Sequence, residues 1–533
     1  MNHDHQSFLC SFRTPRDLSK DHSESQPINL KTTSPLFTMD SIPDEIWREI
    51  FSNFEGHLPL EKWWMYGAEL DVSPLKTLTA ISHTCKRFHR IVNPILYRTV
   101  MAAAFDKDGE ERLVQLARSL VHNPQLGQDT RAIWLGDGCR RGTDDFRDAL
   151  RPAWLSLDAP FFFKKQLGNE IVNRRVVGMT PLILALSPQV RLVDYMYDNT
   201  SPCTTWILSG RPDLELTFKP NYYYEEDELT EEEENALKEY ERGQGDTYAN
   251  YRLSHLEEVR IKHGDCTDSH TCIDDLEPVL LHPNLKTLRL LGIGWLSGPI
   301  SRFKFPNEPC NIETLELKEC LFDHFTLENI LTRCKKLKWL SMETADSRRH
   351  DEGIDDDEWD VDLCKFGDVL RRLGHNLEYF SLHTIEYNHW AFCEGRLGSL
   401  RDLTALRHLQ VILNDFTGRI RDPWEKNLEQ AIPLAEALPP MIETLHLHWD
   451  DEYYGHRDYK RFCDNINGAV FKLIMAADNF PNLRKISMER YGGKRQNGEV
   501  EWDKSVDGWE VEVMQKHMWR DIVRLGACGL SFT

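Results

Sequence analysis

A short apolar pattern, repeated along the C-terminal part of the chain, constrains the fold more than any other feature of the sequence. Each copy has the form apolar-x-x-apolar-x-apolar, as in Leu285-x-x-Leu288-x-Leu290. Successive clear copies begin between 25 (337 − 312) and 41 (483 − 442) residues apart. The eight clear copies begin at Leu256, Leu285, Ile312, Leu337, Leu377, Leu406, Ile442 and Leu483, and a weaker copy begins at Val190.

Between the copies lie stretches with helical spacing of apolar residues, at 325–334, 363–373, 428–438 and 469–479. A single short strand or helix cannot bury its apolar face alone, so neighbouring repeats have to stack. Leucine-rich repeats have periods of about 20–29 residues, so some copies fit this class directly and others require insertions. The sequence therefore predicts an α/β fold, a leucine-rich-repeat-like solenoid of horseshoe shape over residues 185–498.

Two acidic segments, 221–250 and 351–362, fall between copies and are expected to be loop insertions. Residues 499–533 are expected to form a C-terminal cap, because Glu499 to Trp502 and Trp509 to Val513 alternate polar and apolar residues as strands do. Two such strands would cover the apolar edge of the last repeat, which otherwise invites aggregation.

The N-terminal part divides into three segments. Residues 1–38 are polar and lack periodicity, so they are expected to be disordered. Residues 39–100 read as a small all-α module, in which Ser41-Ile42-Pro43-Asp44 opens one helix and Ser73-Pro74 a second. Residues 101–184 are expected to be a linking helical or first-repeat region.

The segment Ile42 to Tyr97 resembles an F-box, through Ile42-Pro43-Asp44-Glu45-Ile46-Trp47-Arg48-Glu49-Ile50-Phe51, Leu75 to Ile81, Cys85-Lys86-Arg87-Phe88 and Leu96-Tyr97-Arg98. F-box modules dock substrate receptors onto the Skp-type adaptor of cullin–RING ubiquitin ligases. The match covers about a tenth of the chain, and the remainder looks like the irregular leucine-rich repeats that fungal F-box proteins often carry. One departure is the stretch Glu55 to Val72, which is longer than the family's usual link between the first two helices.

The resemblance implies an apolar adaptor-binding surface on this module. The residues expected to contact the adaptor are Pro43, Ile46, Ile50, Phe51, Leu75, Leu78, Ile81, Phe88 and Leu96. The alternative is a helical cap that buries these residues internally. A module this small with Ile50, Phe51 and Phe54 outside its own core would present an apolar face, and such a face usually has a partner.

Residues between the buried leucines of each copy should face the opposite side of the sheet, because side chains alternate along a strand. Trp339 and Tyr379, in adjacent copies, could anchor a target, since interface hot spots favour Trp, Tyr and Arg; alternatively they tuck sideways between strands. The residues expected on this concave face are Arg289, Trp339, Ser341, Tyr379, Ser381, His383, His408, Gln410, His446, His448 and Lys485.

The sequence offers no enzyme signature and no cofactor. His263-x-x-Cys266-x-x-x-His270-x-Cys272 has ligands that zinc accepts, but its spacing fits no common zinc finger. The run Asp355 to Asp360 lacks the glycine and ligand spacing of a calcium loop. Nucleophile elbows, phosphate-binding glycine loops and HExxH helices are absent from the sequence. We therefore expect no metal site and no catalytic residue.

Acidic residues outnumber basic ones by 86 to 64, giving a formal charge of −22, which argues against nucleic acid or a membrane surface as the partner. Thirteen scattered cysteines, a polar N-terminus and apolar runs far shorter than the roughly 20 residues of a membrane span indicate a reducing compartment, the cytoplasm or the nucleus. The leading hypothesis is a substrate-recognition subunit of an SCF-type ubiquitin ligase that binds the Skp-type adaptor and an unknown target protein. The alternative is an F-box scaffold that binds the adaptor without a cullin. An enzyme on the repeat surface is a third possibility.

Overall fold

The fold was analysed in a computed structural model of the 533-residue chain. It describes residues 41–59, 63–64, 71–103, 107–136, 145–157, 159, 161–174, 176–197, 201–211, 253–263, 271–295, 308–344, 361–384, 393–418, 431–448, 468–470, 472–488, 492–496, 499–503 and 509–512. The expected disordered tail, both acidic insertions apart from Val361 and Asp362, and most of the candidate zinc segment lie outside these residues.

The described part is an α/β fold built on one long, mostly parallel sheet. Its strands follow one another in the order β1-β2-β3-β4-β6-β8-β9-β11-β13-β14-β15-β18. The strands of this order are β1 (Thr99–Ala103), β2 (Ala132–Gly136), β3 (Leu192–Tyr197), β4 (Glu258–His263), β6 (Thr287–Leu291), β8 (Thr314–Phe322), β9 (Trp339–Thr344), β11 (Tyr379–His383), β13 (His408–Ile412), β14 (Thr444–His448), β15 (Lys485–Met488) and β18 (Trp509–Glu512).

Among the described residues, four further pairings lie off this path. The strands involved are β5 (Thr271–Cys272), β7 (Ile293–Trp295), β10 (Val361–Asp362), β12 (Cys393–Glu394), β16 (Gly492–Gln496) and β17 (Glu499–Asp503). Strand β7 joins β5 to β8, β10 pairs with β12, and β16 pairs with β17. Two strands were expected to cover the last repeat. Strand β18 does so, because it pairs antiparallel with β15, whereas β17 pairs with β16 in a separate sheet.

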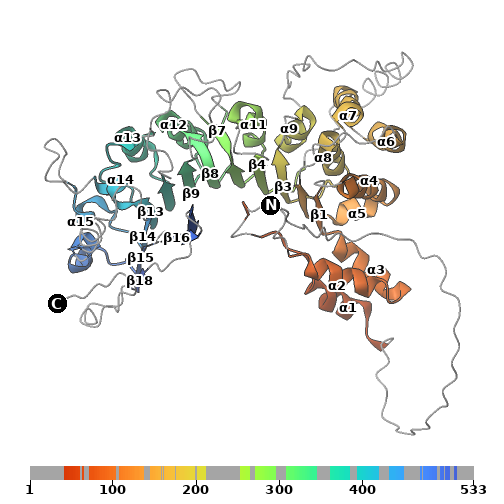
Figure 1. The fold of residues 1–533 in the computed structure, drawn as a ribbon, viewed down its shortest axis with the longest axis horizontal. Helices are drawn as coiled ribbons and strands as arrows, with labels where there is room; N and C mark the ends of the chain where they lie inside the picture. Colours follow the sequence, from red (N-terminus) through yellow and green to blue (C-terminus); the bar gives the residue numbers. More distant parts are fainter. Residues whose placement is uncertain are drawn as a thin grey trace, which may run out of the picture.

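Helices connect most of the strands and lie on the outer side of the arc that the sheet forms (Figure 1). They are α1 (Asp44–Ser52), α2 (Ser73–Ser82), α3 (Lys86–Leu96), α4 (Lys107–His122), α5 (Pro124–Asp129), α6 (Asp145–Leu155), α7 (Phe161–Arg174), α8 (Val176–Ala185), α9 (Pro202–Ser209), α11 (Ile273–Leu280), α12 (His324–Arg333), α13 (Leu363–Leu373), α14 (Leu413–Thr417), α15 (Leu434–Ala437) and the 3-10 turn η5 (Ala477–Asn479). Helices α1–α3 are the exception, because they lie beyond the β1 end of the arc (Figure 1), where α3 contacts β1 and α5.

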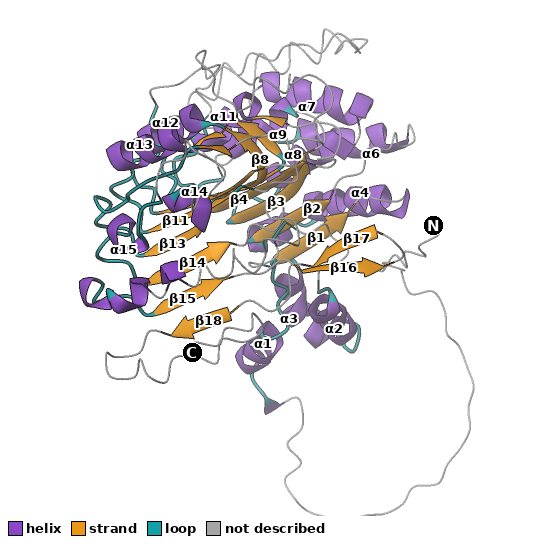
Figure 2. Ribbon diagram, turned by 60° about the vertical axis from the view of Figure 1, so that its left-hand side comes forward, coloured by secondary structure: helices purple, strands orange, loops and turns teal. Residues whose placement is uncertain are grey.

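The pairing of the strands confirms which residues of each copy were predicted to lie opposite one another in the sheet. The central apolar residue of each copy lies opposite that of the next, as in Leu315↔Leu340 and Leu409↔Leu445. The apolar residues that flank it along the chain are buried as well, and together they form one continuous core with the helices. Figure 2 shows the strands side by side, with β18 running opposite to β15.

The same pairing of apolar residues continues into strands β1 and β2, which precede the copies recognised in the sequence. Ile133 in β2 lies opposite Val193, and Val100 in β1 lies opposite Ile133. The described sheet thus begins at Thr99, within the segment 39–100 that was expected to be all helical, and β1 continues into the region 101–184 that was expected to be a linking helical or first-repeat region.

Backbone and amide contacts repeat with the strands. At each parallel step along the main sheet, the carbonyl of the residue before one strand accepts from two consecutive N–H groups at the entry to the next strand. The carbonyl of Lys286, for example, accepts from Glu313 and Thr314. Asparagines just before three copies donate their side-chain amides to a backbone carbonyl of the preceding copy, as Asn311 does to Pro283 at 2.9 Å. These bonds satisfy groups that the short strands leave open, and they hold the spacing between copies.

Candidate docking surfaces

The first candidate surface lies on helices α1–α3, which we call the helical unit. The unit has its own small core, centred on Phe51, Leu78 and Ile95 and separate from the core of the sheet. Trp47, Phe51 and Phe88 form an aromatic cluster inside it, with ring centroids 4.8–5.4 Å apart. One side of each helix therefore packs into this shared core. A second side of α1 takes no part in the core.

An ion pair fixes the start of α1. The Nε atom of Arg87 lies 2.7 Å from Oδ1 of Asp44, and Arg90 contacts the other carboxylate oxygen at 2.7 Å. The hydrogen bond from Arg87 is the main cause that lowers the pKa of Asp44. Arg87 also donates to the carbonyl of Ile42, so the segment that carries Pro43 is tied to α3.

The expected adaptor-binding residues fall into three groups. Pro43, Ile46 and Ile50 are exposed, whereas Leu75, Ile81, Phe88 and Leu96 are half-buried. Phe51 and Leu78 are buried in the core of the helical unit, with 4% and 0% of their surface exposed. The expectation that Phe51 lies outside the core is therefore wrong, because Phe51 follows Trp47 by one helical turn and faces Phe88.

The second side of α1 is apolar and open. Ile46, Ile50 and Phe54 expose 45%, 41% and 37% of their surfaces. They recur every four residues, so the two isoleucines lie one above the other on the helix and Phe54 continues their line just beyond its end. Large apolar side chains exposed together mark an interaction site more often than single ones do. We call these three residues the α1 face.

The second candidate surface is the concave face of the sheet, which carries the residues between the buried apolar ones. Trp339 in β9 and Tyr379 in β11 lie opposite each other in register. Their rings stack with centroids 3.5 Å apart at an angle of 5°. Trp339 still exposes 41% of its surface, whereas Tyr379 is buried because the indole covers it. The sequence predicted both residues here, but only Trp339 is open to a partner.

Four histidines continue this surface across β11, β13 and β14. His408 is 2.9 Å from the Thr444 hydroxyl through Nδ1, and His446 is 2.7 Å from the Ser487 hydroxyl. The rings of His383 and His448 stack at 4.4 Å. His383 and His448 are buried and His446 is half-buried, so the expectation that these concave-face histidines are open to a target is wrong for His383 and His448.

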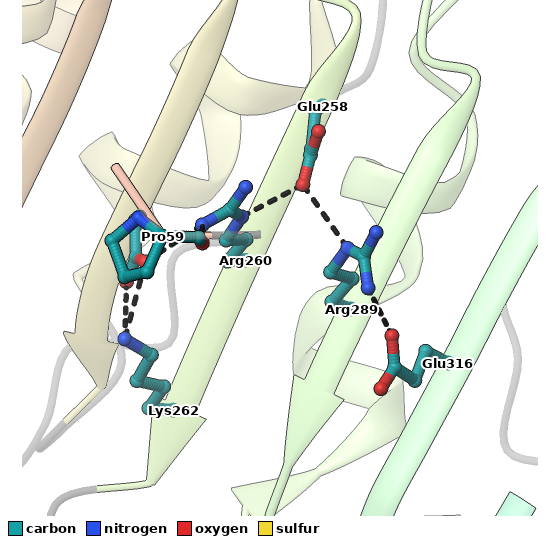
Figure 3. A network of polar contacts seen from close by, with 7 residues as sticks. Pro59, Glu258, Arg260, Lys262, Arg289 and Glu316 are labelled. Atoms are coloured by element: carbon teal, nitrogen blue, oxygen red, sulfur yellow. Dashed lines mark hydrogen bonds and ion pairs between the residues drawn. The ribbon is translucent and has the colours of Figure 1, made fainter. Parts of the chain in front are cut away.

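A network of charged residues occupies the concave face nearer the N-terminus (Figure 3). Asp194 in β3 lies 2.9 Å from Nζ of Lys262 in β4. Glu258 accepts from Arg260 at 2.7 Å and from Arg289 in β6 at 3.1 Å. Arg289 also pairs with Glu316 in β8, so this predicted target-binding residue is already held by two carboxylates.

Burial outweighs attraction in the deepest part of this network. It is the main cause that raises the pKa of Asp194 and the main cause that lowers the pKa of Lys262, against the opposing effect of their ion pair. Side chains of Asp194, Arg260 and Lys262 are almost fully enclosed. The sequence pattern predicts Arg289 on this face but not its carboxylate partners, although the register of the repeats places Glu316 directly opposite Arg289.

The described residues contain no group of three or more His, Cys, Asp or Glu side chains arranged to hold a metal ion. Among the helices described, none is long and apolar enough to cross a membrane. No protein-family model matches this chain, and no curated protein matches it.

Proposed function

We propose that this chain is a target-recognition subunit of an SCF-type ubiquitin ligase. In this proposal the helical unit is an F-box that binds a Skp-type adaptor, and the long sheet with its outer helices is a leucine-rich-repeat solenoid that binds a target protein. The chain itself performs no chemistry. It raises the local concentration of the target's lysines near the charged conjugating enzyme, and this proximity accelerates ubiquitin transfer.

The observation that carries the proposal is the α1 face. Its three side chains are excluded from the core of the helical unit, which is completed by Trp47, Phe51 and Phe88 on another side of the helices. Covering the 37–45% of each side chain that is still exposed would contribute less than half of the roughly 1.5–3 kcal/mol that full burial provides. A docking partner that covers the face recovers this free energy, and Pro43, Ile46 and Ile50 are the residues of the F-box resemblance that lie open for it.

The target side of the proposal rests on the concave face. Curved repeat sheets provide extended concave surfaces that suit protein targets. Trp339 is an exposed aromatic side chain on this face, and stacking on Tyr379 restricts its rotamers. A rigid indole loses little entropy on binding, which is a property of interface hot spots.

Co-purification with a Skp-type adaptor and a cullin tests the adaptor side. We expect the double variant Ile46→Asp/Ile50→Asp to lose adaptor binding by about a hundredfold or more, because charged groups would be buried without partners. Arg48→Asp is the matched control, since it adds the same carboxylate to an exposed position on the same helix. Unchanged adaptor binding by a folded double variant would refute the F-box assignment. Adaptor recovered without cullin would instead favour the scaffold alternative.

A further inference from the structure

The described residues between α1 and α2 contact several strands of the concave face. The described residues 55–59 and 63–64 form what we call the strap. The Gly56 carbonyl accepts from the Thr99 hydroxyl of β1 at 2.6 Å, and the Pro59 carbonyl accepts from Arg260 of β4 at 2.5 Å. Figure 3 shows Pro59 next to Arg260, at the edge of the charged network.

The aromatic end of the strap lies further along the sheet. Trp63 is completely buried and forms a small apolar cluster with Leu291 of β6 and its neighbour Trp64. The ammonium group of Lys318 in β8 lies 4.5 Å from the centroid of the Trp64 ring. The strap therefore meets β1, β4, β6 and β8 in the same order as the sheet presents them.

The surface beneath the strap suits an internal occupant. Its charged groups comprise four carboxylates and four cations: Asp194, Glu258, Glu316, Glu343, Arg260, Lys262, Arg289 and Lys318. Their charges cancel, so this part of the face attracts neither an acidic nor a basic partner from a distance. A carbonyl placed on Arg260 and an indole ring placed over Lys318 satisfy cations locally without adding charge.

We propose that the strap is a built-in ligand of the concave face. It fixes the helical unit to the sheet and closes the surface over β4, β6 and β8 to other partners, which leaves the part from Trp339 onward for a target. Trp63 and Leu291 form a third cluster, separate from the cores of the helical unit and of the sheet, so the apolar contact is made by the strap itself with β6. The strap leaves the α1 face exposed.

Lysine footprinting of the full chain tests the closure. Lys318 is nearly buried, whereas Lys338 is 58% exposed. An amine-acetylating reagent should modify Lys318 at least about tenfold more slowly than Lys338, because reaction requires local opening. In Trp63→Ser/Trp64→Ser we expect Lys318 to react at least about fivefold faster, with Lys338 unchanged. Trp339→Ser is the matched control, since it removes an indole from the same face outside the strap.

Amide exchange of the unaltered chain provides a second measurement that does not depend on how the variant folds. A docked strap should slow amide exchange in residues 55–58, 63 and 64 by about a hundredfold or more relative to an unstructured peptide. Exchange at the unstructured rate would overturn the docking. Lys318 reacting as fast as Lys338 in the unaltered chain, or at the same rate after the double change, would overturn the closure. Both measurements use the chain alone, so they stand or fall independently of adaptor and target binding.

Discussion

Removing the carboxylate of Asp194 is expected to be one of the most damaging single changes in the sheet. Asp194 is 2.9 Å from the ammonium group of Lys262 and 3.7 Å from the guanidinium group of Arg260, and all three are almost fully enclosed. Asp194→Asn leaves both cations buried with less compensating charge. Breaking a buried ion pair from one side typically costs about 3–5 kcal/mol of unfolding free energy.

Replacing both members of the pair should cost much less. Burial is the main influence on the pKa of each group, raising that of Asp194 and lowering that of Lys262. The attraction between them thus fails to offset the loss of hydration. The double variant Asp194→Leu/Lys262→Met removes both burial costs, and Arg260 keeps Glu258 at 2.7 Å. We expect it to be neutral or more stable than the natural chain by about 1–4 kcal/mol.

Urea unfolding followed by tryptophan fluorescence and by far-ultraviolet circular dichroism measures these differences. The two signals should give coincident transitions if the sheet unfolds as one unit. Glu257→Gln is the control, because its partner Lys286 is exposed and 3.9 Å away, and surface pairs contribute about 0–1 kcal/mol. The reasoning is refuted if Asp194→Asn costs no more than this control, or if the double variant costs as much as Asp194→Asn alone.

Two further outcomes follow from burial. Leu445→Ala should lower the unfolding free energy by about 2–5 kcal/mol, because Leu445 is buried. His446→Ala, at its half-buried neighbour on the concave face, should lower it by only about 1 kcal/mol through the lost contact with Ser487. Equal losses in urea unfolding would contradict the strand register. Burial raises the pKa of Glu170 from 4.5 to about 7, so the folded chain holds a proton that the unfolded chain releases. Stability should therefore fall by roughly 3 kcal/mol as pH rises from about 4.5 to about 7 and then level off. Glu170→Gln should flatten this fall in urea midpoints between pH 5 and 8, while Glu436→Gln, at an exposed site, should not.

The periodic part of the fold could be predicted because its physical cause is local. The apolar residues of every clear copy whose side chains are described are buried, and neighbouring copies pair in the predicted phase. Strands β1 and β2 were missed because their copies are weak: Tyr97-x-x-Val100-x-Ala102 ends in a small residue, and Thr130 opens the copy that contains Ile133. Thr130 is buried all the same, because its hydroxyl donates to the Leu126 carbonyl.

Exposure within each surface was harder to predict, since it depends on side chains from other elements. His448 follows the alternation that places it on the concave face, yet His383, two strands away, covers it. Phe51 carries the F-box resemblance as strongly as Ile50 does, but Phe88 of α3 encloses only Phe51. Alternation along a strand and spacing along a helix define which side a residue faces; packing between elements decides what remains accessible there.

The long link between α1 and α2 likewise depends on packing against distant elements and not on a local sequence pattern. In the sequence it is only a departure from the usual F-box length, and its tryptophans have no periodic partner. In the structure, Pro59 and Arg260 are 201 residues apart and share a hydrogen bond, while Trp63 completes an apolar contact with Leu291. A free loop of this length would add conformational entropy between the two binding surfaces. Because the strap instead rests on the sheet, the distance and orientation between the α1 face and Trp339 become properties of the fold. For a subunit whose proposed role is to hold a target near another enzyme, such a fixed geometry would restrict which target lysines are reached.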